Sequence, residues 1–187
     1  MITRYLTDSL RYDGTQLRAH WILRTTGICG DALVAWRGPC RVHTDEIADL
    51  ADVAGPGIAG DDMLHFLWER FDDCDLERAV LRQRLMSAIA REVLVELAPT
   101  APVLRLGDDL HVGPGKLSIS IATRSLVSTL IHFAVNVTNS GTPVATAALA
   151  DLGVEPRHFA ERLLARVAAE MESVQTARAK VRGRDEA

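Results

Sequence analysis

The sequence lacks the features that mark an exported, membrane-embedded or nucleic-acid-binding protein. No apolar run reaches the roughly 18 residues that a membrane-spanning helix needs, because the most apolar window, 127–137, is interrupted by polar side chains. The first residues include Arg4, Asp8 and Arg11, where a signal peptide would have an apolar stretch. Charges of both signs are spread along the chain with a net charge of −4, so we expect no surface for nucleic acid or for an anionic membrane.

Cysteine is scarce as well. Cys29, Cys40 and Cys74 lie too far apart for a Cys-x-x-Cys metal or redox site, and their number is odd. We therefore expect reduced thiols in a cytoplasmic protein. With 187 residues, of which 48% are hydrophobic, the chain can form one substantial core. We expect a single domain over 1–187 whose charged tail, 180–187, is frayed.

What the sequence does contain is a mixture of strand and helix patterns. Alternation and turn residues predict extended segments over 16–43, 107–123 and 128–138, with an Asp- and Gly-rich loop over 44–60. Apolar residues at helical spacing predict helices over 61–71, 81–97 and from Glu155-Pro156 onward. The expected buried stripes of the last two are Leu81, Leu85, Ile89, Val93 and Leu97, then Phe159, Leu163, Val167, Met171 and Val174. This order predicts an α+β fold in which a mixed or antiparallel sheet packs against helices.

The most informative stretch, 107–121, predicts a hairpin that presents one lysine. Leu110 and Val112 favour a short strand, Gly113-Pro114-Gly115 favours a turn, and the alternation that begins at Lys116 favours a second strand. Alternation places on one face Lys116, Ser118, Ser120 and Ala122, and on the other Leu117, Ile119 and Ile121. A face with one cation and two hydroxyls suits an anionic ligand. The plainer interpretation is an exposed strand with a solvated lysine.

The order of motifs from Asp108 to Gly153 resembles the catalytic domain of biotin protein ligases, which are relatives of lipoate ligases and share a fold with class II aminoacyl-tRNA synthetases. The stretch 107–110 (Gly-Asp-Asp-Leu) is similar to their Pro-Asn-Asp-Leu/Ile motif, and 116–120 (Lys-Leu-Ser-Ile-Ser) to their Lys-Leu-Ala-Gly-Ile motif. The strand 130–137 resembles their Gly-Ile-Gly-Ile-Asn-Val strand. This likeness covers the second half of the chain, and the chain as a whole resembles an uncharacterised microbial family assigned to the same fold.

The resemblance implies an ATP-dependent, carboxylate-activating ligase or acyltransferase that forms an acyl adenylate. Lys116 is the expected catalytic residue, because an ammonium group offsets the repulsion between a carboxylate and a phosphate. Asp109 and Asp108 are the expected ligands of Mg²⁺. The residues expected to contact substrate or nucleotide are Arg37, Gly38, Arg41, His43, Ser118, Ser120, His132 and Asn136. The first four are a loose counterpart of the glycine- and arginine-rich loop that covers the adenylate in biotin ligases.

Each of these assignments has a structural alternative. The two aspartates can be turn residues, His132 a satisfied core histidine, and Asn136 a partner of a neighbouring loop; His65 is interpreted as packing. The alternative function is a catalytically silent module that holds a nucleotide or a small acid, since the loop that would cover the adenylate from water is missing. A purely structural role is favoured only if Lys116 is buried in a salt bridge. Because 138–153 contains no cysteine, a thioester mechanism of the octanoyltransferase type is not expected.

Two replacements indicate which substrates the site accepts. Ile119 stands where biotin ligases keep a glycine, and His132 replaces a second glycine. We therefore expect biotin, lipoate and octanoate not to bind, and a compact polar carboxylate or a nucleotide to bind. We also expect a two-fold homodimer, the commonest closed assembly, with Trp21 and Trp36 as exposed apolar candidates. A protein acceptor is the other partner that a ligase reaction would require.

Overall fold

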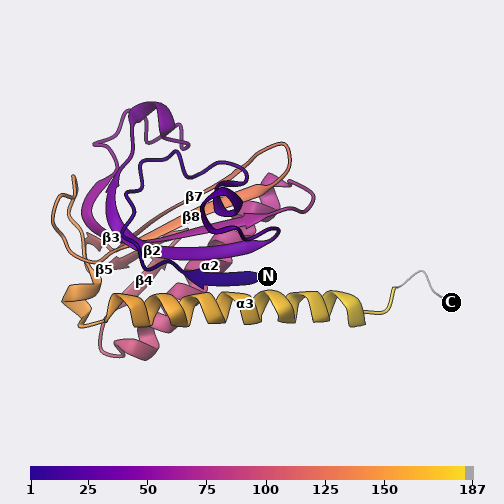
Figure 1. Cartoon of the computed structure of the whole chain (residues 1–187). Helices are drawn as coiled ribbons and strands as arrows, with labels where there is room; N and C mark the ends of the chain where they lie inside the picture. The colour runs from indigo at the N-terminus through magenta and orange to yellow at the C-terminus, as the bar shows by residue number, and fades with distance from the viewer. Residues whose placement is uncertain (184–187) are drawn as a thin grey trace.

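Residues 1–183, which the computed structural model describes, form a five-stranded mixed sheet with a smaller three-stranded sheet beside it (Figure 1). The large sheet has the order β1 (Ile2–Tyr5), β2 (Ala32–Arg41), β3 (Ala59–Arg70), β8 (Thr129–Asn136) and β7 (Ser118–Arg124). The small sheet consists of β4 (Val103–Leu106), β5 (Asp109–Val112) and β6 (Gly115–Lys116). Only β1 and β2 pair in parallel within the described sheets, and all other neighbours are antiparallel.

The helices are α1 (Trp21–Thr26), α2 (Leu76–Leu97) and α3 (Pro156–Lys180), with 3₁₀ turns η1 (Thr44–Glu46) and η2 (Leu149–Leu152). The carboxylate of Asp75 accepts from the Arg78 N–H and so begins α2. At the start of α3, Glu155 accepts from two backbone N–H groups, and a proline occupies the first turn, where no intrahelical donor is needed. The expected opening of the C-terminal helix is confirmed.

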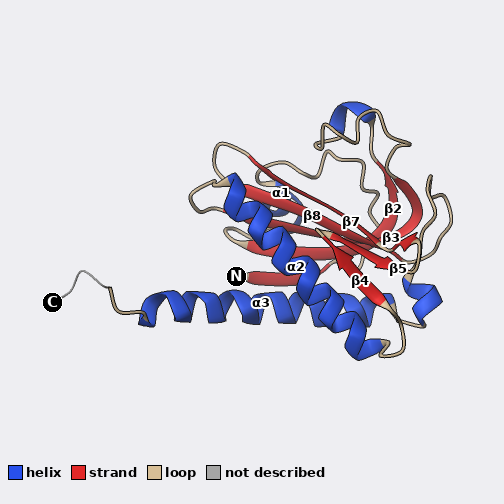
Figure 2. Cartoon of the chain, turned by 180° about the vertical axis from the view of Figure 1, so that it is seen from behind, coloured by secondary structure: helices blue, strands red, loops and turns tan. Residues whose placement is uncertain are grey.

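The two long helices cover one face of the large sheet (Figure 2). Phe133 of β8 and Phe159 of α3 both pack against Phe66 of β3, at ring-centroid distances of 6.0 and 6.2 Å, and all three are fully buried. The side chains of α3 at 159, 163, 167 and 171 are buried as expected, whereas Val174 is 40% exposed because α3 extends past the sheet. The alternation expected over 128–138 is confirmed, since the large apolar side chains of β8 join this core.

The opposite face of the sheet is covered by irregular chain rather than by long helices. Trp36 lies at its centre, fully buried, and donates from Nε1 to the carbonyl of Leu10 at 3.0 Å. Gly38 is required here, because a Cβ at that position would lie 2.1 Å from the same carbonyl oxygen. Trp21 packs beside Trp36 at 5.3 Å and is half-buried, so the expectation of two exposed tryptophans is wrong. The homodimer itself stays a prediction.

Two sequence-based assignments of secondary structure are wrong. The segment predicted as a helix over 61–71 lies in β3 up to Arg70. The pattern misled because 63–68 is a continuous run of buried side chains in the middle of the sheet, and such a run has no period that separates strand from helix. Conversely, Trp21–Thr26 is helical, and Gly27 ends it in a left-handed conformation with φ 73°.

The buried face of α2 also differs from the expected stripe. Ile89 and Val93 are buried as expected, but Leu81 is 63% exposed, and Met86 and Ala90 join the core, with Ala79 also buried. The small side chains allow close approach of the helix, which a pattern search for large residues misses. The tail expected from residue 180 falls partly on 184–187, outside the described residues. Over residues 1–183 no helix combines the length and hydropathy that would carry it across a membrane.

Candidate functional site

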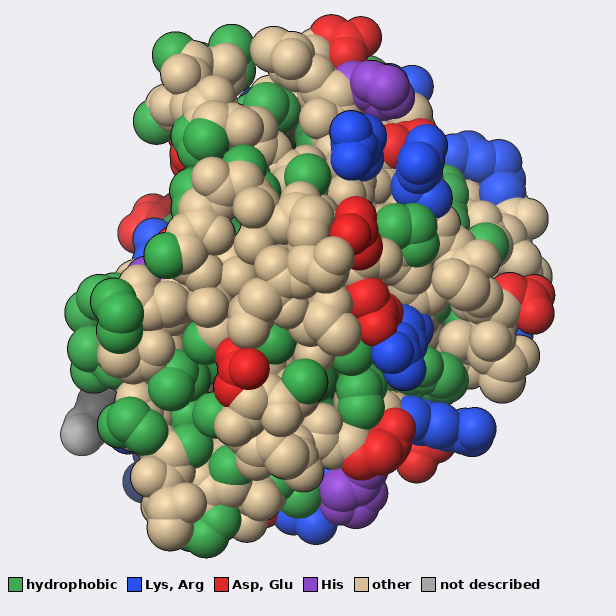
Figure 3. Space-filling view, turned by 90° about the vertical axis from the view of Figure 1, so that its left-hand side faces the viewer, with side chains coloured by type: hydrophobic (Ala, Val, Ile, Leu, Met, Phe, Trp, Pro, Cys, Tyr) green, Lys and Arg blue, Asp and Glu red, His purple; other side chains and the backbone are tan. Residues whose placement is uncertain are grey.

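A pocket of about 390 Å³ opens on the sheet face opposite α2 and α3. Its floor comes from β3, β8 and β7, one wall from the loop 42–58, and the other from the β5–β6 hairpin and the loop 142–146. The described lining contains five carboxylates and a single Lys or Arg: Glu46, Asp49, Asp52, Asp108, Asp109 and Lys116. In Figure 3 acidic side chains run down the middle of one end of the molecule, with most of the basic ones to their right.

Lys116 is held in this pocket by its backbone. Its N–H donates to the carbonyl of Ala145 at 3.2 Å, and its own carbonyl accepts from Ala147 N–H at 3.1 Å and from Asn136 Nδ2 at 3.0 Å. The preceding Gly115 lies so close to the loop that a Cβ would approach Thr146 to 2.8 Å. The hairpin therefore fixes the base of the lysine side chain and leaves its ammonium group in the pocket.

The Lys116 ammonium forms an ion pair with Asp109, at 2.8 Å between Nζ and Oδ2. The two side chains are 36% and 26% exposed, so the pair is neither buried nor fully solvated. The condition that would favour a purely structural lysine, burial in a salt bridge, is not met. Burial raises the pKa of Asp109, although the neighbouring ammonium group opposes this shift.

Asp108 is directed away from the lysine and toward α2. Its Oδ2 accepts from Gln83 Nε2 at 2.7 Å, and its Oδ1 pairs with Arg84 Nη1 at 2.8 Å. Within residues 1–183 there is no group of three or more His, Cys, Asp and Glu side chains able to hold a metal ion. Because Mg²⁺ is commonly held by one or two carboxylates together with phosphate oxygens, Asp109 fits that role and Asp108 does not.

His132 lines the pocket and is paired with a second buried histidine, His65, which lies behind it and does not line the pocket; the sequence indicated only His132 as a binding residue. His65 Nε2 lies 3.1 Å from the carbonyl of Gly38, and His65 Nδ1 lies 3.2 Å from His132 Nε2. Tyr12 stacks flat on His132, with ring centroids 3.6 Å apart and planes inclined by 5°. Burial lowers the pKa of His65 to about 4 and holds the pKa of His132 well below 6.5. The sequence could have marked His65 as a candidate, because it is a histidine inside an otherwise apolar run.

The serines expected beside the lysine point elsewhere. Ser118 is buried, and its Oγ accepts from Leu110 N–H at 2.8 Å. Ser120 borders the pocket, but its Oγ donates to the backbone carbonyl of His132 at 3.1 Å. The side chains expected on the opposite face, Ile119 and Ile121, line the pocket instead. The assignment of faces is wrong because the chain leaves β6 and enters β7 at residue 117, which breaks the alternation.

Asn136 supports the alternative interpretation made for it. Its Nδ2 donates to the carbonyl groups of Lys116 and Ala147, at 3.0 and 3.1 Å, so the amide positions the hairpin against the following loop. The pocket thus brings together six of the eleven residues expected in the site: Asp108, Asp109, Lys116, Ser120, His132 and Asn136.

The remaining candidates from the first half of the chain lie outside the pocket. Arg37 forms a two-point ion pair with Asp62, at 2.8 Å from Nε and 2.5 Å from Nη2. Arg41 and His43 are exposed and do not line the pocket, and the carbonyl of Gly38 contacts His65. Arg37 and Arg41 are therefore not among the residues that the described structure brings to the pocket, and their contact with a phosphate stays a prediction.

A family model described as "Domain of unknown function (DUF366)" matches residues 1–182. The chain belongs to this DUF366 family. Uncharacterized protein MJ0805 of Methanocaldococcus jannaschii is 35% identical to it over 157 residues, which are 81% of this chain and 70% of that protein. A protein of unknown function from Pyrococcus horikoshi is 38% identical, covers 97% of this chain and 98% of its own, and has a TM-score of 0.91.

More distant structures confirm the fold that the resemblance predicted. The biotin protein ligase of Aquifex aeolicus, in complex with biotin and ATP, has a TM-score of 0.63 at 13% identity and covers 90% of this DUF366 chain and 70% of its own. Ta0514, a candidate lipoate protein ligase from T. acidophilum with bound lipoic acid, has a TM-score of 0.57 at 17% identity and covers 90% and 86%. At these identities the likeness establishes the α+β fold of biotin and lipoate ligases, and no more.

Proposed function

We propose that this DUF366 protein is an ATP-dependent carboxylate-activating enzyme, an acyl-adenylate-forming ligase or acyltransferase whose substrate is neither biotin nor lipoate. The observation that carries the proposal is the placement of Lys116. On a ligase-type fold, its backbone is fixed by three hydrogen bonds and its ammonium group enters a preformed pocket. The sequence contains only one other lysine, Lys180, although it has 21 basic residues in all. A compact point charge is thus present where the proposed chemistry needs one.

The lysine would act by neutralising two anions that must approach each other. Bound MgATP would supply the adenylyl group, a carboxylate oxygen being joined to the α-phosphorus while the bond from that phosphorus to pyrophosphate breaks. Lys116 would bind the carboxylate and an α-phosphate oxygen and so offset their repulsion as negative charge builds up. Asp109 is the resting partner of the ammonium group. When an anionic substrate takes its place at the ammonium group, the carboxylate of Asp109 would be released from this pair and could hold Mg²⁺.

The lining explains why the substrate should differ from biotin and lipoate. Ile119 and Ile121 project into the volume, which Met63 narrows from the floor. Over-packing a filled site costs on the order of 1–3 kcal/mol. An unsubstituted acyl chain such as octanoate would in addition cover His132 without offering it a hydrogen bond. A compact, polar carboxylate fits the narrowed volume and can form a hydrogen bond with His132.

A second candidate function is a catalytically silent module that binds a small acid. The observation that favours it is the acidic lining, in which Lys116 is the single Lys or Arg among residues 1–183, while Arg37 and Arg41 lie outside. A triphosphate would be repelled by this lining unless a divalent cation accompanied it. A monocarboxylate, which carries one charge, would be repelled far less.

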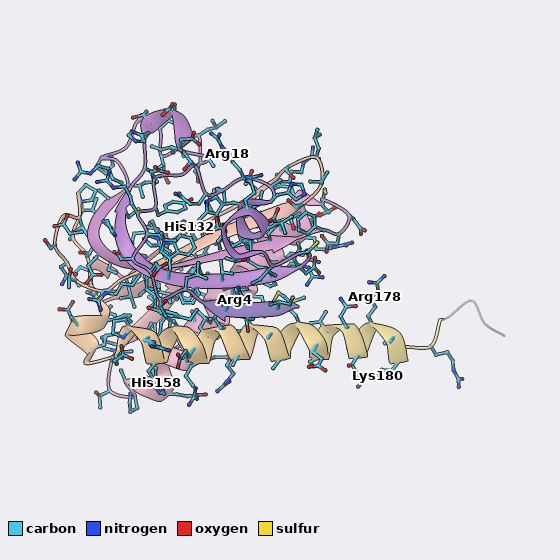
Figure 4. All side chains as sticks on the ribbon, in the orientation of Figure 1. Arg4, Arg18, His132, His158, Arg178 and Lys180 are labelled. Carbon is cyan, nitrogen blue, oxygen red and sulfur yellow. The ribbon has the colours of Figure 1, made fainter. Side chains whose placement is uncertain are left out.

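Exchange of pyrophosphate with ATP, measured with Mg²⁺ over a panel of small carboxylates, separates the two. The proposed enzyme gives exchange with at least one carboxylate, and Lys116→Ala and Lys116→Arg lower it by at least about 100-fold. Lys180→Ala, at the exposed end of α3 (Figure 4), leaves the rate unchanged. Binding of a carboxylate without exchange in the wild-type protein would refute the enzyme and support the binding module.

The two aspartates provide a matched pair of variants for the metal. Asp109→Asn is expected to raise the Mg²⁺ concentration needed for half-maximal exchange by about tenfold or more. Asp108→Asn is expected to leave that concentration unchanged, because Asp108 contacts Gln83 and Arg84. Equal effects of the two substitutions would contradict the assignment of Asp109 as the metal ligand.

A further inference from the structure

The hydrogen bonds of the two buried histidines determine which ring nitrogens carry hydrogen. The carbonyl of Gly38 can only accept, so His65 Nε2 carries a hydrogen and donates to it. In a neutral imidazole the other nitrogen then has a lone pair, and His65 Nδ1 accepts from His132 Nε2, 3.2 Å away. By the same rule, Nδ1 of a neutral His132 has no hydrogen. The chain of bonds therefore ends in a lone pair on His132 Nδ1.

Both rings have physical reasons to stay neutral. His65 is fully buried and His132 is 2% exposed, so a positive charge on either ring would lose nearly all of its hydration. If both rings were protonated, two imidazolium cations would also lie within hydrogen-bond distance of each other. Tyr12, which covers the face of His132, brings no negative charge, and burial raises the pKa of its phenol. The carboxylate whose charge acts on His65 is that of Asp62, and it is already paired with Arg37.

The unpaired nitrogen belongs to a residue that lines the pocket. Among residues 1–183 no protein group forms a hydrogen bond with His132 Nδ1, although His132 contributes to the pocket lining. In Figure 4 His132 lies in the body of the molecule, beneath the loops that cover this face of the sheet. Nδ1 is not one of the fully buried side-chain atoms that lack a partner in the described residues, so it remains accessible, and a ligand or a water molecule in the pocket can donate to it.

From this arrangement we infer that His132 Nδ1, oriented by His65, is the specificity-determining acceptor of the pocket, and that it selects carboxylates carrying an N–H or O–H donor on a compact ring. The inference rests on the proposed function in one respect, that the carboxylate of the ligand binds Lys116. The same lining contains the apolar side chains of Ile119, Ile121 and Met63, which suit a hydrophobic ring. A planar ring acid with one N–H group combines these features.

The tautomers can be tested without a ligand, by nitrogen-15 NMR of protein labelled in its histidines. At neutral pH, His65 and His132 should both be neutral and carry hydrogen on Nε2, with Nδ1 giving the signal of a lone-pair nitrogen. His158, exposed on α3, serves as the reference for a solvated ring. A hydrogen on Nδ1 of His132, or an imidazolium at either position, would overturn the inference.

The selectivity can be tested with indole-3-acetate and benzofuran-3-acetate, which differ only in a ring N–H against a ring oxygen. Calorimetric titration in the absence of ATP should show at least tenfold tighter binding of the indole, because the ring oxygen would face a lone pair. His132→Phe should abolish the preference, and His158→Phe should retain it. Equal binding of both acids, binding of neither, or a preference that survives His132→Phe would overturn the inference.

These measurements remain decisive if the substitution prevents folding, because the tautomers and the ratio of the two affinities are read from the wild-type protein. They also separate this inference from the proposed function. No ATP is present, so the absence of pyrophosphate exchange would refute the enzyme while leaving the acceptor role of His132 intact. Conversely, exchange with an acid that has no donor would support the enzyme and contradict the selectivity.

Discussion

The two faces of the large sheet are built from the same strands but by different means. On the face under α2 and α3, strand β8 presents Ile131, Phe133 and Val135 to a core of aliphatic and aromatic side chains. On the other face the same strand presents His132 and Asn136 to a pocket roofed by loops. Because alternate residues of one strand face opposite ways, stability and recognition are assigned to neighbouring positions. A substitution one residue along the chain should therefore change a different property.

The largest effect is expected on the helix-covered face. Phe133→Ala removes a fully buried ring that packs on Phe66, and should lower the free energy of unfolding by about 3–5 kcal/mol. Ile121→Ala, a half-buried position that lines the pocket, should cost about 1 kcal/mol. Urea unfolding followed by circular dichroism measures both. Comparable losses at the two positions would contradict the division between the faces.

A smaller effect should come from acid. An unfolded histidine takes up a proton near pH 6.5, whereas burial lowers the pKa of His65 in the folded protein to about 4. Between these values the unfolded state binds more protons, so stability is complete above pH 6.5 and falls as the pH decreases. The loss is about 1.4 kcal/mol per pH unit for one such group, and roughly 3 kcal/mol over the whole window.

Urea unfolding between about pH 7 and pH 5 tests this, since most carboxylates remain ionised there. The matched control is His158→Phe, which removes an exposed histidine and should leave the slope unchanged. A free energy of unfolding that stays constant over this range would show that the pair is not held neutral by the fold.

Asn136 contributes both to stability and to ligand binding, so its substitution should affect both. Asn136→Ala leaves the carbonyl groups of Lys116 and Ala147 without their side-chain donor and should cost about 1–3 kcal/mol of stability. It should also weaken the binding of a carboxylate, because the base of the lysine is no longer fixed. Asn136→Asp should not restore either property, since an ionised carboxylate cannot donate. Wild-type behaviour of Asn136→Asp in titration calorimetry would rule out the positioning role.

The smallest effect on stability is expected for the residue on which function depends most. Lys116→Ala removes half of a partly exposed ion pair and should change the free energy of unfolding by less than about 1 kcal/mol. A loss as large as that for Phe133→Ala would make the lysine structural. Differential scanning calorimetry of the two variants side by side gives the comparison.

The sequence predicted those parts of the molecule in which the apolar residues follow one clear period, that of a strand or that of a helix. β8 alternates cleanly, and α3 has its apolar residues at helical spacing, so both were found with the correct buried face. The hairpin was found because its turn, Gly113 to Gly115, has the residues that such a turn needs. The order of these motifs was enough to indicate the ligase-type fold.

The errors have identifiable physical causes. β3 is buried on both faces, which removes its period, and this also concealed His65. The change of strand at residue 117 reversed the faces that alternation assigned to Ser118 and Ile119. Arg37 and Arg41 were chosen by resemblance to a loop, but in the structure they lie on β2 and outside the pocket. Contacts between residues far apart in sequence, such as Asn136 with Lys116, leave no local pattern.

The walls of the pocket differ in how they are attached to the rest of the protein. Asn136 ties one wall to the sheet through two carbonyl groups, so that wall should move only with the sheet. The opposite wall, 42–58, contacts the N-terminal segment through a long backbone hydrogen bond, from His43 N–H to the carbonyl of Asp13 at 3.4 Å, and through the ion pair of Glu46 with Arg18, whose side chain is 61% exposed. Salt screens exposed charges strongly. Ligand exchange should therefore proceed through the 42–58 side, and rising ionic strength should speed both entry and release while the equilibrium affinity of a neutral ligand stays nearly constant.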